Sequence, residues 1–462
     1  MKNNRDFLQN NAAIELSKLN NEILNKNGSK PLAYVRTFGC QQNEADSERL
    51  RGILIALGYS LCDAPENADC ILVNTCAIRE HAEIKALSII GQFKHLKAAK
   101  PSLVIGVCGC MAAELHRTEQ LKLRYPYVDF TIPPASDALL PEYILNALSR
   151  KRNFSCHELN ADPPSAYITP VRSSAIKAWV SIMYGCNNFC SYCIVPYVRG
   201  RERSRPYEEI VEEVKYLIAN GYKDITLLGQ NVNSYNGGCS FSELLNKLSL
   251  LEGDYVLRFM TSHPKDVTPE LIDVMASSDK IARHFHLPLQ SGSDVVLNKM
   301  NRRYTTEKYL GHVDMLRDRI PDICITSDII VGFPGETEED FERTLDMINK
   351  VKFDMLYSFI YSPRNGTPAA AMENQIPREV QNARFDRLLK LQNDIAESIN
   401  KEAVGKTLRV LCDGSSKTDS TVLSGRTDGN KLVLFNGTAQ EGTFTNVKIT
   451  DAEPYALHGI QI

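Results

Sequence analysis

Short apolar runs alternate with amphipathic stretches over the first third of the chain. Three of these runs are Leu32–Phe38, Cys70–Asn74 and Leu103–Val107, and each is followed by apolar positions at helical spacing. A buried strand followed by an amphipathic helix is a βα unit, and successive βα units form a parallel sheet. We therefore predict a doubly wound α/β domain at residues 32–149. The Asn- and Lys-rich residues 1–31 before it are predicted to be a flexible or marginally helical extension.

Six more apolar runs follow, again alternating with amphipathic stretches. They predict strands at Ile176–Met183, Asp224–Leu228, Tyr255–Met260, His284–Leu287, Ile323–Ile330 and Asp354–Ile360. Six βα units make an incomplete (β/α)6 barrel at residues 172–400, in which chemistry gathers at the carboxyl ends of the strands. At residues 401–462 the pattern changes to short alternating strands separated by turns, which predicts a small all-β barrel. The predicted fold class is α/β.

Length and composition describe a globular chain of several domains. The 462 residues suggest about three domains, and 43% hydrophobic against 24% charged residues allow a sizeable core. The chain shows no apolar run as long as a membrane span, and its start lacks the apolar region of a signal peptide. We therefore expect a cytoplasmic protein that has no membrane partner. The formal net charge of −3 means that any nucleic-acid contact must come from local basic patches.

Thirteen cysteines without a secretory signal indicate reduced thiols used for metal or redox chemistry. Three of them, Cys186, Cys190 and Cys193, share one short loop. A four-iron cluster needs four ligands, so three cysteines leave one iron free to bind something else. A structural zinc site would need a fourth Cys or His, and none lies within ten residues of Cys193. The spacing resembles the cluster loop of the radical S-adenosylmethionine (SAM) enzymes, whose open iron binds SAM.

A second group of three cysteines is scattered along the sequence. Cys40, Cys76 and Cys110 each come a few residues after one of the first three predicted strands. Residues at equivalent strand ends of an open α/β sheet converge in space, so a second three-cysteine site is possible. The alternative is that these are buried free thiols, which pack as small hydrophobic side chains. Cys108 is also an alternative to Cys110 as the third cysteine of this site, because the two lie close together in the sequence. The spacing alone leaves this second site open.

Polar and glycine-rich segments follow the predicted barrel strands, where ligands of such barrels bind. These segments include Gly229–Asn231, Gln290–Ser293 and Gly332–Glu336. We interpret His263 as structural because a proline follows it, and we assign no side chain as a general acid or base. The candidate SAM-binding residues are Gln230, Asn231, Ser262, Gln290, Ser291, Asp328 and Gly332.

Two basic groups are candidates for nucleic-acid contact. Arg199, Arg201, Arg203 and Arg205 come directly after the cluster loop, where they could hold phosphates. A run of charges is otherwise a solvated face. In the last domain, Arg426 and Lys431 lie beside Phe435 in the sequence, a combination that suits phosphate contact and base stacking. The acidic and basic residues of that domain balance, which weakens the electrostatic argument for RNA.

Taken together, these segments resemble the methylthiotransferase family of radical SAM enzymes over residues 32–462, including the order of its domains and its C-terminal TRAM domain. Within that family the chain is most similar to the members that modify N6-(dimethylallyl)adenosine of tRNA. The motifs that carry the resemblance are Thr37–Asn43, Asn74–Glu80, Pro196–Arg201, Leu228–Asn233 and His286–Ser293.

The resemblance implies two 4Fe–4S clusters. Cys40, Cys76 and Cys110 would bind an auxiliary cluster, and Cys186, Cys190 and Cys193 the radical SAM cluster. One SAM would donate a methyl group and another would be the radical source. The implied reaction is methylthiolation of C2 of N6-(dimethylallyl)adenosine at position 37, next to the anticodon, in tRNAs that read codons beginning with U.

The partners implied by the resemblance are the anticodon loop of tRNA and an external electron donor such as a flavodoxin or ferredoxin system. We expect a monomer. Within the family, threonylcarbamoyladenosine of tRNA and an aspartate of a ribosomal protein are alternative substrates. From another class, the chain could be a metal-stabilised RNA-binding protein without catalytic activity. The open fourth ligand position argues against that alternative.

Overall fold

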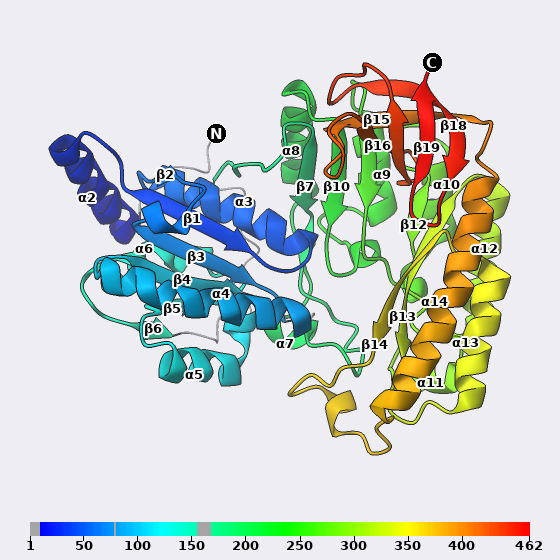
Figure 1. Cartoon of the computed structure of the whole chain (residues 1–462), viewed down its shortest axis with the longest axis horizontal. Helices are drawn as coiled ribbons and strands as arrows, with labels where there is room; N and C mark the ends of the chain where they lie inside the picture. The colour runs from blue at the N-terminus through cyan, green and yellow to red at the C-terminus, as the bar shows by residue number, and fades with distance from the viewer. Residues whose placement is uncertain (1–9, 78–79, 155–167) are drawn as a thin grey trace. The chain divides into compact units, whose positions relative to one another are not determined.

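The computed structural model describes residues 10–77, 80–154 and 168–462, which form two compact units. The first, here called the N-terminal unit, comprises residues up to 173 together with 183–187 and 193–205. The second, the C-terminal unit, comprises 174–182, 188–192 and 206–462 (Figure 1). Among the described residues, every helix is too short or too polar to cross a bilayer.

The N-terminal unit contains a six-stranded sheet whose strands are all parallel, in the order β2-β1-β3-β4-β5-β6. Every residue of the central strands β3 and β4 is buried, because helices cover both faces of the sheet. The strands are β1 (Leu32–Thr37), β2 (Ser60–Leu61), β3 (Cys70–Thr75), β4 (Val104–Gly109), β5 (Phe130–Ile132) and β6 (Asn153–Phe154). The predicted doubly wound α/β fold is confirmed for this unit.

The helices of this unit divide into two layers. Side chains of α2, α3 and α6 share one apolar core with the sheet, and side chains of α4 and α5 share the other. The helices are α2 (Asn11–Asn27), α3 (Gln41–Ala56), α4 (Glu80–Ala99), α5 (Leu115–Arg124), α6 (Leu140–Leu148) and α7 (Val195–Arg199), with a 3-10 turn η2 at Cys110–Ala113.

Residues 11–27 form a helix, so the helical alternative is correct for them and the flexible one is wrong. Asn10 caps helix α2 by accepting a hydrogen bond from the backbone of Ala12, at 3.0 Å, and Gly28 ends the helix in a left-handed conformation. Ala13 and Leu16 are fully buried in the core. The apolar face of this segment therefore outweighs its polar composition. Residues 1–9 lie outside the described part of the chain.

The C-terminal unit contains the predicted incomplete barrel. Two parallel three-stranded sheets, β7-β10-β11 and β12-β13-β14, are joined by hydrogen bonds of Leu257 with the backbone of Lys280 and Ala282, at 2.7 and 2.9 Å. All six predicted strands are present, with ends shifted by a few residues. They are β7 (Lys177–Ser181), β10 (Asp224–Leu228), β11 (Val256–Phe259), β12 (His284–His286), β13 (Cys324–Val331) and β14 (Met355–Ile360).

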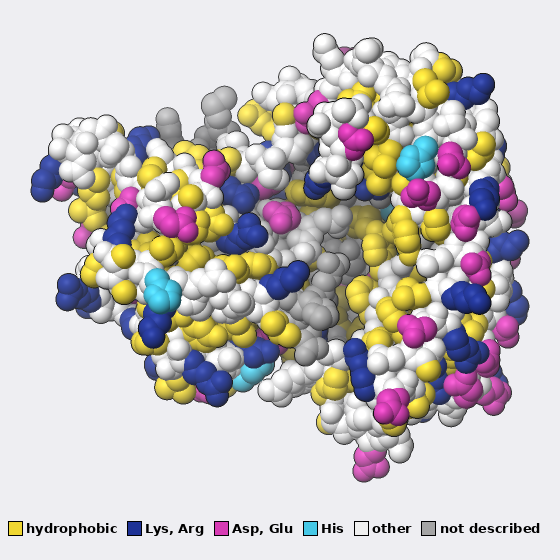
Figure 2. Space-filling model, in the orientation of Figure 1, with side chains coloured by type: hydrophobic (Ala, Val, Ile, Leu, Met, Phe, Trp, Pro, Cys, Tyr) yellow, Lys and Arg dark blue, Asp and Glu magenta, His cyan; other side chains and the backbone are white. Residues whose placement is uncertain are grey.

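Helices pack on the outside of this barrel, as Figure 1 shows. They are α8 (Tyr207–Ala219), α9 (Phe241–Ser249), α10 (Pro269–Ala276), α11 (Asp294–Lys299), α12 (Thr306–Arg319), α13 (Glu338–Val351) and α14 (Arg378–Lys401). Basic and acidic side chains are interspersed over the outer helices α12–α14 (Figure 2). Several of them pair directly: Arg387 binds Glu338 at 2.5 Å, and Arg343 binds Glu339 at 2.6 Å.

A closed five-stranded barrel follows helix α14, in the order β15-β16-β17-β19-β18. Its strands are β15 (Thr407–Ser415), β16 (Leu423–Thr427), β17 (Leu432–Asn436), β18 (Phe444–Ala452) and β19 (Leu457–Gln461). The buried Arg258 of β11 fixes this small barrel to the larger one. Its guanidinium donates to the carbonyls of Thr427 and Asp428, both at 3.0 Å, and binds Asp224 of β10 at 3.0 Å.

The expected stacking role of Phe435 is wrong. Its side chain is 1% exposed and forms part of the core of the small barrel, together with Val410 and Val433. Strand β17 alternates inward and outward positions, and Phe435 falls on the inward face. Lys431, expected beside it, instead binds Asp354 at 2.7 Å.

Candidate functional site

The three scattered cysteines lie at one edge of the N-terminal sheet. Cys40 follows β1 and caps helix α3, Cys76 follows β3, and Cys110 begins the turn η2 after β4. Strands β1, β3 and β4 are neighbours in the sheet, so their carboxyl ends meet. The pKa of the Cys110 thiol is raised to about 12, mainly by burial; Arg199 opposes this shift, and the nearby Cys76 and Cys40 add to it. The three thiols are therefore electrostatic neighbours.

Two glycines allow these turns to approach one another. Gly39 has φ +136°, and a Cβ there would lie 2.7 Å from the Cβ of Cys76. Gly109 has φ +90°, and a Cβ there would lie 2.5 Å from the carbonyl of Thr75. Both positions combine a backbone conformation that favours glycine with a contact that only glycine permits.

Two buried asparagines tie the same turns together. Asn43 donates to the side-chain oxygen of Asn74 at 3.3 Å and to the carbonyl of Thr75 at 3.0 Å. Asn74 donates in return to the carbonyl of Asn43 at 2.8 Å and to the hydroxyl of Ser47 at 2.9 Å. The thiol of Cys40 also lies 3.4 Å from Asn43 Oδ1. Sequence reasoning gave these asparagines no role, although both lie within the motifs around Cys40 and Cys76.

Cys108 lies within strand β4, whereas Cys110 begins the turn η2 after the strand has ended, and this difference decides between them. Cys108 points into the apolar core with Val104 and Phe130 and is 3% exposed. Burial raises its pKa well above the ordinary value, and the next contributions come from Asp137 and Cys70. Cys110, two residues later, belongs instead to the group of thiols with Cys40 and Cys76. Cys108 is a core side chain.

The donor chemistry of this group fits an iron–sulfur cluster. Within residues 10–77, 80–154 and 168–462, no three His, Cys, Asp or Glu side chains lie close enough to hold a single metal ion. A four-iron cluster is larger than one ion, and each cysteine ligand binds a different iron. Three thiols from three strand ends, without a neighbouring imidazole, match that larger group. All twelve described cysteines are free of disulfides.

The loop Cys186–Cys193 has residues in both units. In the N-terminal unit, the backbone N–H of Cys186 donates to the carbonyl of Gly200 at 3.1 Å, and that of Asn187 donates to Glu202 at 3.1 Å. These bonds fold the start of the loop onto the segment after α7.

In the C-terminal unit, the thiol of Cys190 accepts a hydrogen bond from Nη1 of Arg302 at 3.4 Å. Arg302 is 5% exposed, and its other nitrogens donate to Tyr304 Oη at 3.2 Å and to the carbonyl of Pro288 at 2.9 Å. The hydroxyl of Ser191 donates to the carbonyl of Lys299 at 2.8 Å. A buried guanidinium beside a thiolate stabilises its negative charge. No spacing or composition in the sequence marks Arg302.

The strand ends of the large barrel contain strained backbone and buried polar atoms that lack partners. Thr261 after β11 and Gln290 after β12 have φ +71° and +70°, an unusual conformation above all for a β-branched residue. Among the described residues, Gln230 Oε1, Asn231 Oδ1 and Ser262 Oγ are buried and have no hydrogen-bond partner. Such unsatisfied atoms indicate the position of a polar ligand.

His263 adds a hydrogen-bond donor to this region, although we expected it to be structural only. Its Nδ1 accepts from the backbone N–H of Lys265 at 3.2 Å. Burial lowers the pKa of this imidazole, and the charges of Arg302 and Lys265 lower it further. The ring is therefore neutral and carries its proton on Nε2, which is buried and lacks a partner in the described part of the chain.

Comparisons with known proteins cover the same regions. Residues 180–348 match the Radical SAM superfamily, residues 32–133 the Uncharacterized protein family UPF0004, and residues 401–462 the TRAM domain. The tRNA-2-methylthio-N(6)-dimethylallyladenosine synthase of Caldicellulosiruptor saccharolyticus is 48% identical over 450 residues, which cover 96% of this chain and 95% of that protein. The enzyme of the same name from Clostridium botulinum is 46% identical, with 96% of this chain and 100% of that protein covered. This chain belongs to their family.

A solved structure shows the same fold at low sequence identity. The radical S-adenosylmethionine methyltransferase TsrM from Kitasatospora setae is 15% identical, with a TM-score of 0.55 over 74% of this chain and 77% of that one. The resemblance to the methylthiotransferases and the predicted C-terminal TRAM domain are both confirmed. As a radical SAM enzyme, this synthase-family member uses SAM and a 4Fe–4S cluster.

The remaining SAM candidates of this synthase-family chain are engaged within the protein to different degrees. The N–H of Gly332 donates to Glu336 at 2.8 Å, and its carbonyl accepts from Gln381 at 3.1 Å. The hydroxyl of Ser291 is fully buried and accepts from the backbone of Ser293 at 3.2 Å.

Asp328 and Gln290 complete this set. A carboxylate oxygen of Asp328 lies 3.6 Å from Nε2 of His286, and its side chain is partly exposed. The backbone N–H of Gln290 donates to the carbonyl of Asp328 at 2.8 Å. Of the seven candidates, Gln230, Asn231 and Ser262 therefore present buried atoms that a ligand could satisfy.

The arginines after the cluster loop do not form one basic patch. Arg199 is 3% exposed and binds Asp46 at 2.9 Å, and Arg205 is also buried. Arg203 is half-buried and donates to the carbonyl of Arg199 at 3.0 Å. Arg201 is exposed. The expected RNA contact is therefore wrong for Arg199, because a buried, paired guanidinium cannot reach a phosphate.

Arg426 lies in a small cavity of about 170 Å³ that is also lined by His284, Asp354 and Lys431. Its guanidinium donates to the carbonyl of Asn430 at 3.1 Å, and the residue is half-buried. Contact between Arg426 and RNA stays a prediction.

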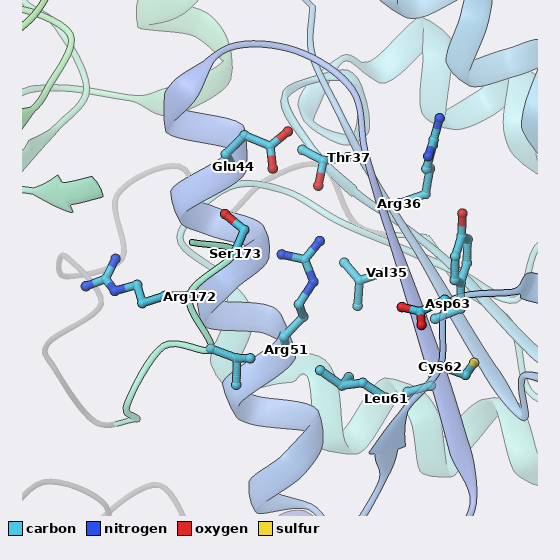
Figure 3. A pocket seen from close by; sticks show the side chains of 13 residues that line it. Val35, Arg36, Thr37, Glu44, Arg51, Leu61, Cys62, Asp63, Arg172 and Ser173 are labelled. Atoms are coloured by element: carbon cyan, nitrogen blue, oxygen red, sulfur yellow. The ribbon is translucent and has the colours of Figure 1, made fainter. Parts of the chain in front are cut away.

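A larger cavity of about 470 Å³ lies beside β1 and α3. Figure 3 shows the guanidinium of Arg51 at its centre, with Glu44 and Thr37 at one end and Leu61 at the other. Its lining contains none of the six cysteines of the two triplets. This cavity and the candidate metal ligands of the N-terminal unit are therefore separate features.

Proposed function

We propose that this protein attaches a methylthio group to C2 of N6-(dimethylallyl)adenosine in tRNA, with two 4Fe–4S clusters. Cys186, Cys190 and Cys193 hold the cluster that binds SAM. The auxiliary cluster is bound by the N-terminal triplet of Cys40, Cys76 and Cys110. The observation that carries the proposal is the pair of triplets, each one ligand short of the four that a four-iron cluster takes.

The chemistry of the target explains why such cofactors are needed. The hydrogen on C2 of an adenine ring is neither acidic nor displaceable, so acid–base side chains cannot replace it. When bound, the clusters and SAM supply the radical chemistry for this position.

The polypeptide itself binds the clusters, SAM and the target base, and shields them from water. Its thiolates hold the clusters, and the buried guanidinium of Arg302 balances charge at Cys190. The unsatisfied atoms of Gln230, Asn231, Ser262 and His263 offer SAM or the target base hydrogen bonds in a site from which water is excluded.

The names of the relatives and the TRAM domain support tRNA as the substrate. An adenosine in the anticodon loop is single-stranded, so moving it out of its stack costs little free energy. The exposed Arg201 is the member of its group placed to contact phosphate, and Arg426 is a second candidate. The preference for tRNAs that read codons beginning with U stays a prediction.

Mass spectrometry of tRNA nucleosides tests the proposal. A strain that lacks this gene should lose the methylthio mark from its prenylated adenosine, and the intact gene should restore it. Cys190→Ala should fail to restore the mark, because the cluster that binds SAM loses a ligand. Cys62→Ser is the matched control: this half-buried thiol donates to the carbonyl of Ala64 at 3.4 Å and belongs to neither triplet. It should restore the mark fully.

Two outcomes would contradict the proposal. If the deletion strain keeps the mark on prenylated adenosine and loses it from threonylcarbamoyladenosine, the substrate is wrong. If Cys190→Ala restores the mark as well as the intact gene does, the chain acts without its radical SAM cluster. An external flavodoxin or ferredoxin system as electron donor, a monomeric state and a cytoplasmic location stay predictions.

A further inference from the structure

Arg199 is a buried cation with one side of its guanidinium unused. The residue ends helix α7 and is 3% exposed. Its Nη2 donates to Asp46 at 2.9 Å, whereas its Nη1 is buried and has no hydrogen-bond partner within the described part of the chain. A buried charged donor without a partner is costly, so its retention calls for an explanation.

The surroundings of Arg199 place it at the N-terminal cysteine triplet. Helix α7 packs against the turn η2 that begins at Cys110, and Val198 shares an apolar cluster with Cys110 and Ala77. Asp46 lies in helix α3, which begins directly after Cys40. All of these residues belong to the N-terminal unit.

The electrostatics of Arg199 agree with this placement. Burial lowers the pKa of its guanidinium, but Cys110, Asp46 and Cys40 raise it by more, and the net shift is upward. The side chain is therefore a permanent positive charge beside two of the three candidate ligands. Such a charge, in surroundings of low dielectric constant, attracts anions strongly.

Asp46 alone does not satisfy this cation. Asp46 is shared, because Arg49 lies 3.5 Å from its other oxygen. Arg49 has Asp137 as a second carboxylate partner, and its Nη1 donates to Tyr184 at 3.1 Å. Arg199 has a single carboxylate partner among the described residues, and the donors of Nη1 remain for another anion.

We propose that Arg199 is a positioning residue for the auxiliary cluster. Its Nη1 donates a charge-assisted hydrogen bond to an anionic sulfur ligand, a hydrosulfide or an alkylthiolate, on the iron that the three cysteines leave open. Asp46 fixes the guanidinium in the orientation that this bond requires. The inference rests on the proposed function, because it needs a cluster at Cys40, Cys76 and Cys110.

Arg302 at the other triplet does not carry the same inference. Its Nε, Nη1 and Nη2 all have partners, in Tyr304, Cys190 and Pro288. Arg302 therefore balances charge and fixes its loop, with no nitrogen left unpaired. The unused Nη1 distinguishes Arg199, and a purely structural ion pair with Asp46 would not need it.

The test uses full-length protein in which Cys186, Cys190 and Cys193 are all changed to Ala, so that it carries the auxiliary cluster alone. Sodium methanethiolate is titrated into the reduced, anaerobic protein, and binding is followed by the electron paramagnetic resonance of the cluster. The reduction potential is measured in the same samples. Arg199→Met removes the charge, Arg199→Lys retains it, and Arg201→Met is the matched control at an exposed arginine of the same segment.

We expect Arg199→Met to weaken methanethiolate binding by about tenfold or more, as for loss of a charge-assisted hydrogen bond. The reduction potential should fall, because a nearby positive charge favours the reduced cluster. Arg199→Lys should recover most of the potential but only part of the binding, since an ammonium lacks the planar fork of a guanidinium. Arg201→Met should match the parent protein in both measurements.

Unchanged binding and potential in Arg199→Met would overturn the proposal. If Arg199→Met loses its iron, Arg199→Lys decides: retained iron with the parent's potential supports a role of the charge, and loss of iron there too contradicts it. A parent protein that binds no auxiliary iron would instead refute the proposed function. The two failures are therefore distinguishable.

Discussion

At the scale of single residues, buried polar side chains organise both cysteine triplets. Arg199 and Arg302 place a cation beside thiolates, and Asn43 and Asn74 fix the turns that carry Cys40 and Cys76. Buried polar groups of this kind contribute most when every partner is satisfied. The side chains that arrange the two triplets are therefore not themselves candidate ligands of iron.

Asn74→Ala tests the bonds between these turns. The change removes the buried hydrogen bonds that Asn74 makes with Asn43 and Ser47, and we expect the free energy of unfolding to fall by about 1–3 kcal/mol. Auxiliary iron should be lost while the radical SAM cluster remains. Chemical denaturation and iron analysis measure the two effects. Asn67→Ala, at an exposed asparagine, is the control and should change neither.

Sequence reasoning found the six cysteines but misjudged Arg199. Four arginines in one short segment suggested a phosphate-binding face. The prediction failed for Arg199 because a run of charges in the sequence gives no information about burial. The short helix α7 turns Arg199 inward to Asp46, and only tertiary contacts establish that direction. Arg302 and the two asparagines were missed for the same reason.

At the scale of elements, the strands that carry chemistry were the ones that the sequence predicted well. These strands lie in largely apolar stretches, such as Cys70–Thr75 and Val104–Gly109, and the cysteines and polar turns follow them within a few residues. Strands β2 and β6 were missed because two residues are too few to show any period. Helix α2 was predicted only as a marginal alternative because its polar face is wide.

Strands β12 and β13 contain a histidine pair that should make stability depend on pH. The rings of His284 and His286 lie 2.9 and 3.0 Å from the hydroxyl of Thr326. That hydroxyl has one proton, so it donates to one ring and accepts from the other. The pKa of His284 falls to about 3, mainly because the ring is buried and in part because of the neighbouring His286, Arg258 and Arg426.

The direction of the pH effect on stability follows from the protonation of His284 in the folded and the unfolded chain. Below pH 6.5 the unfolded chain protonates His284 and the folded chain does not, so the stability present above pH 6.5 is lost as the pH falls. We expect a loss of about 1 kcal/mol between pH 6.5 and 5.5, and a slope that approaches about 1.4 kcal/mol per pH unit at lower pH. Denaturation of anaerobic protein at several pH values measures this slope. The slope should be shallower in His284→Gln, and an unchanged slope would show that this ring does not titrate on unfolding.

At the scale of the whole molecule, the two units contain different groups of candidate residues, and the Cys186–Cys193 loop has residues in both. The N-terminal unit groups Cys40, Cys76 and Cys110 at the edge of a parallel sheet. The C-terminal unit contains the barrel with its unsatisfied strand ends and the TRAM barrel, which Arg258 fixes to it. The family and the domain order could be inferred from the sequence because the motifs are long. Residue-level SAM contacts could not, because they depend on which strand-end groups the protein satisfies internally.

The two triplets are proposed to bind two separate clusters. Iron analysis of anaerobically reconstituted protein measures this number directly. We expect about eight irons per chain, about four in Cys76→Ala and about four in Cys190→Ala, and almost none when both changes are combined. Cys62→Ser should keep about eight. If either single change removes all the iron while circular dichroism shows an intact fold, the two triplets serve one common centre, and the account is contradicted.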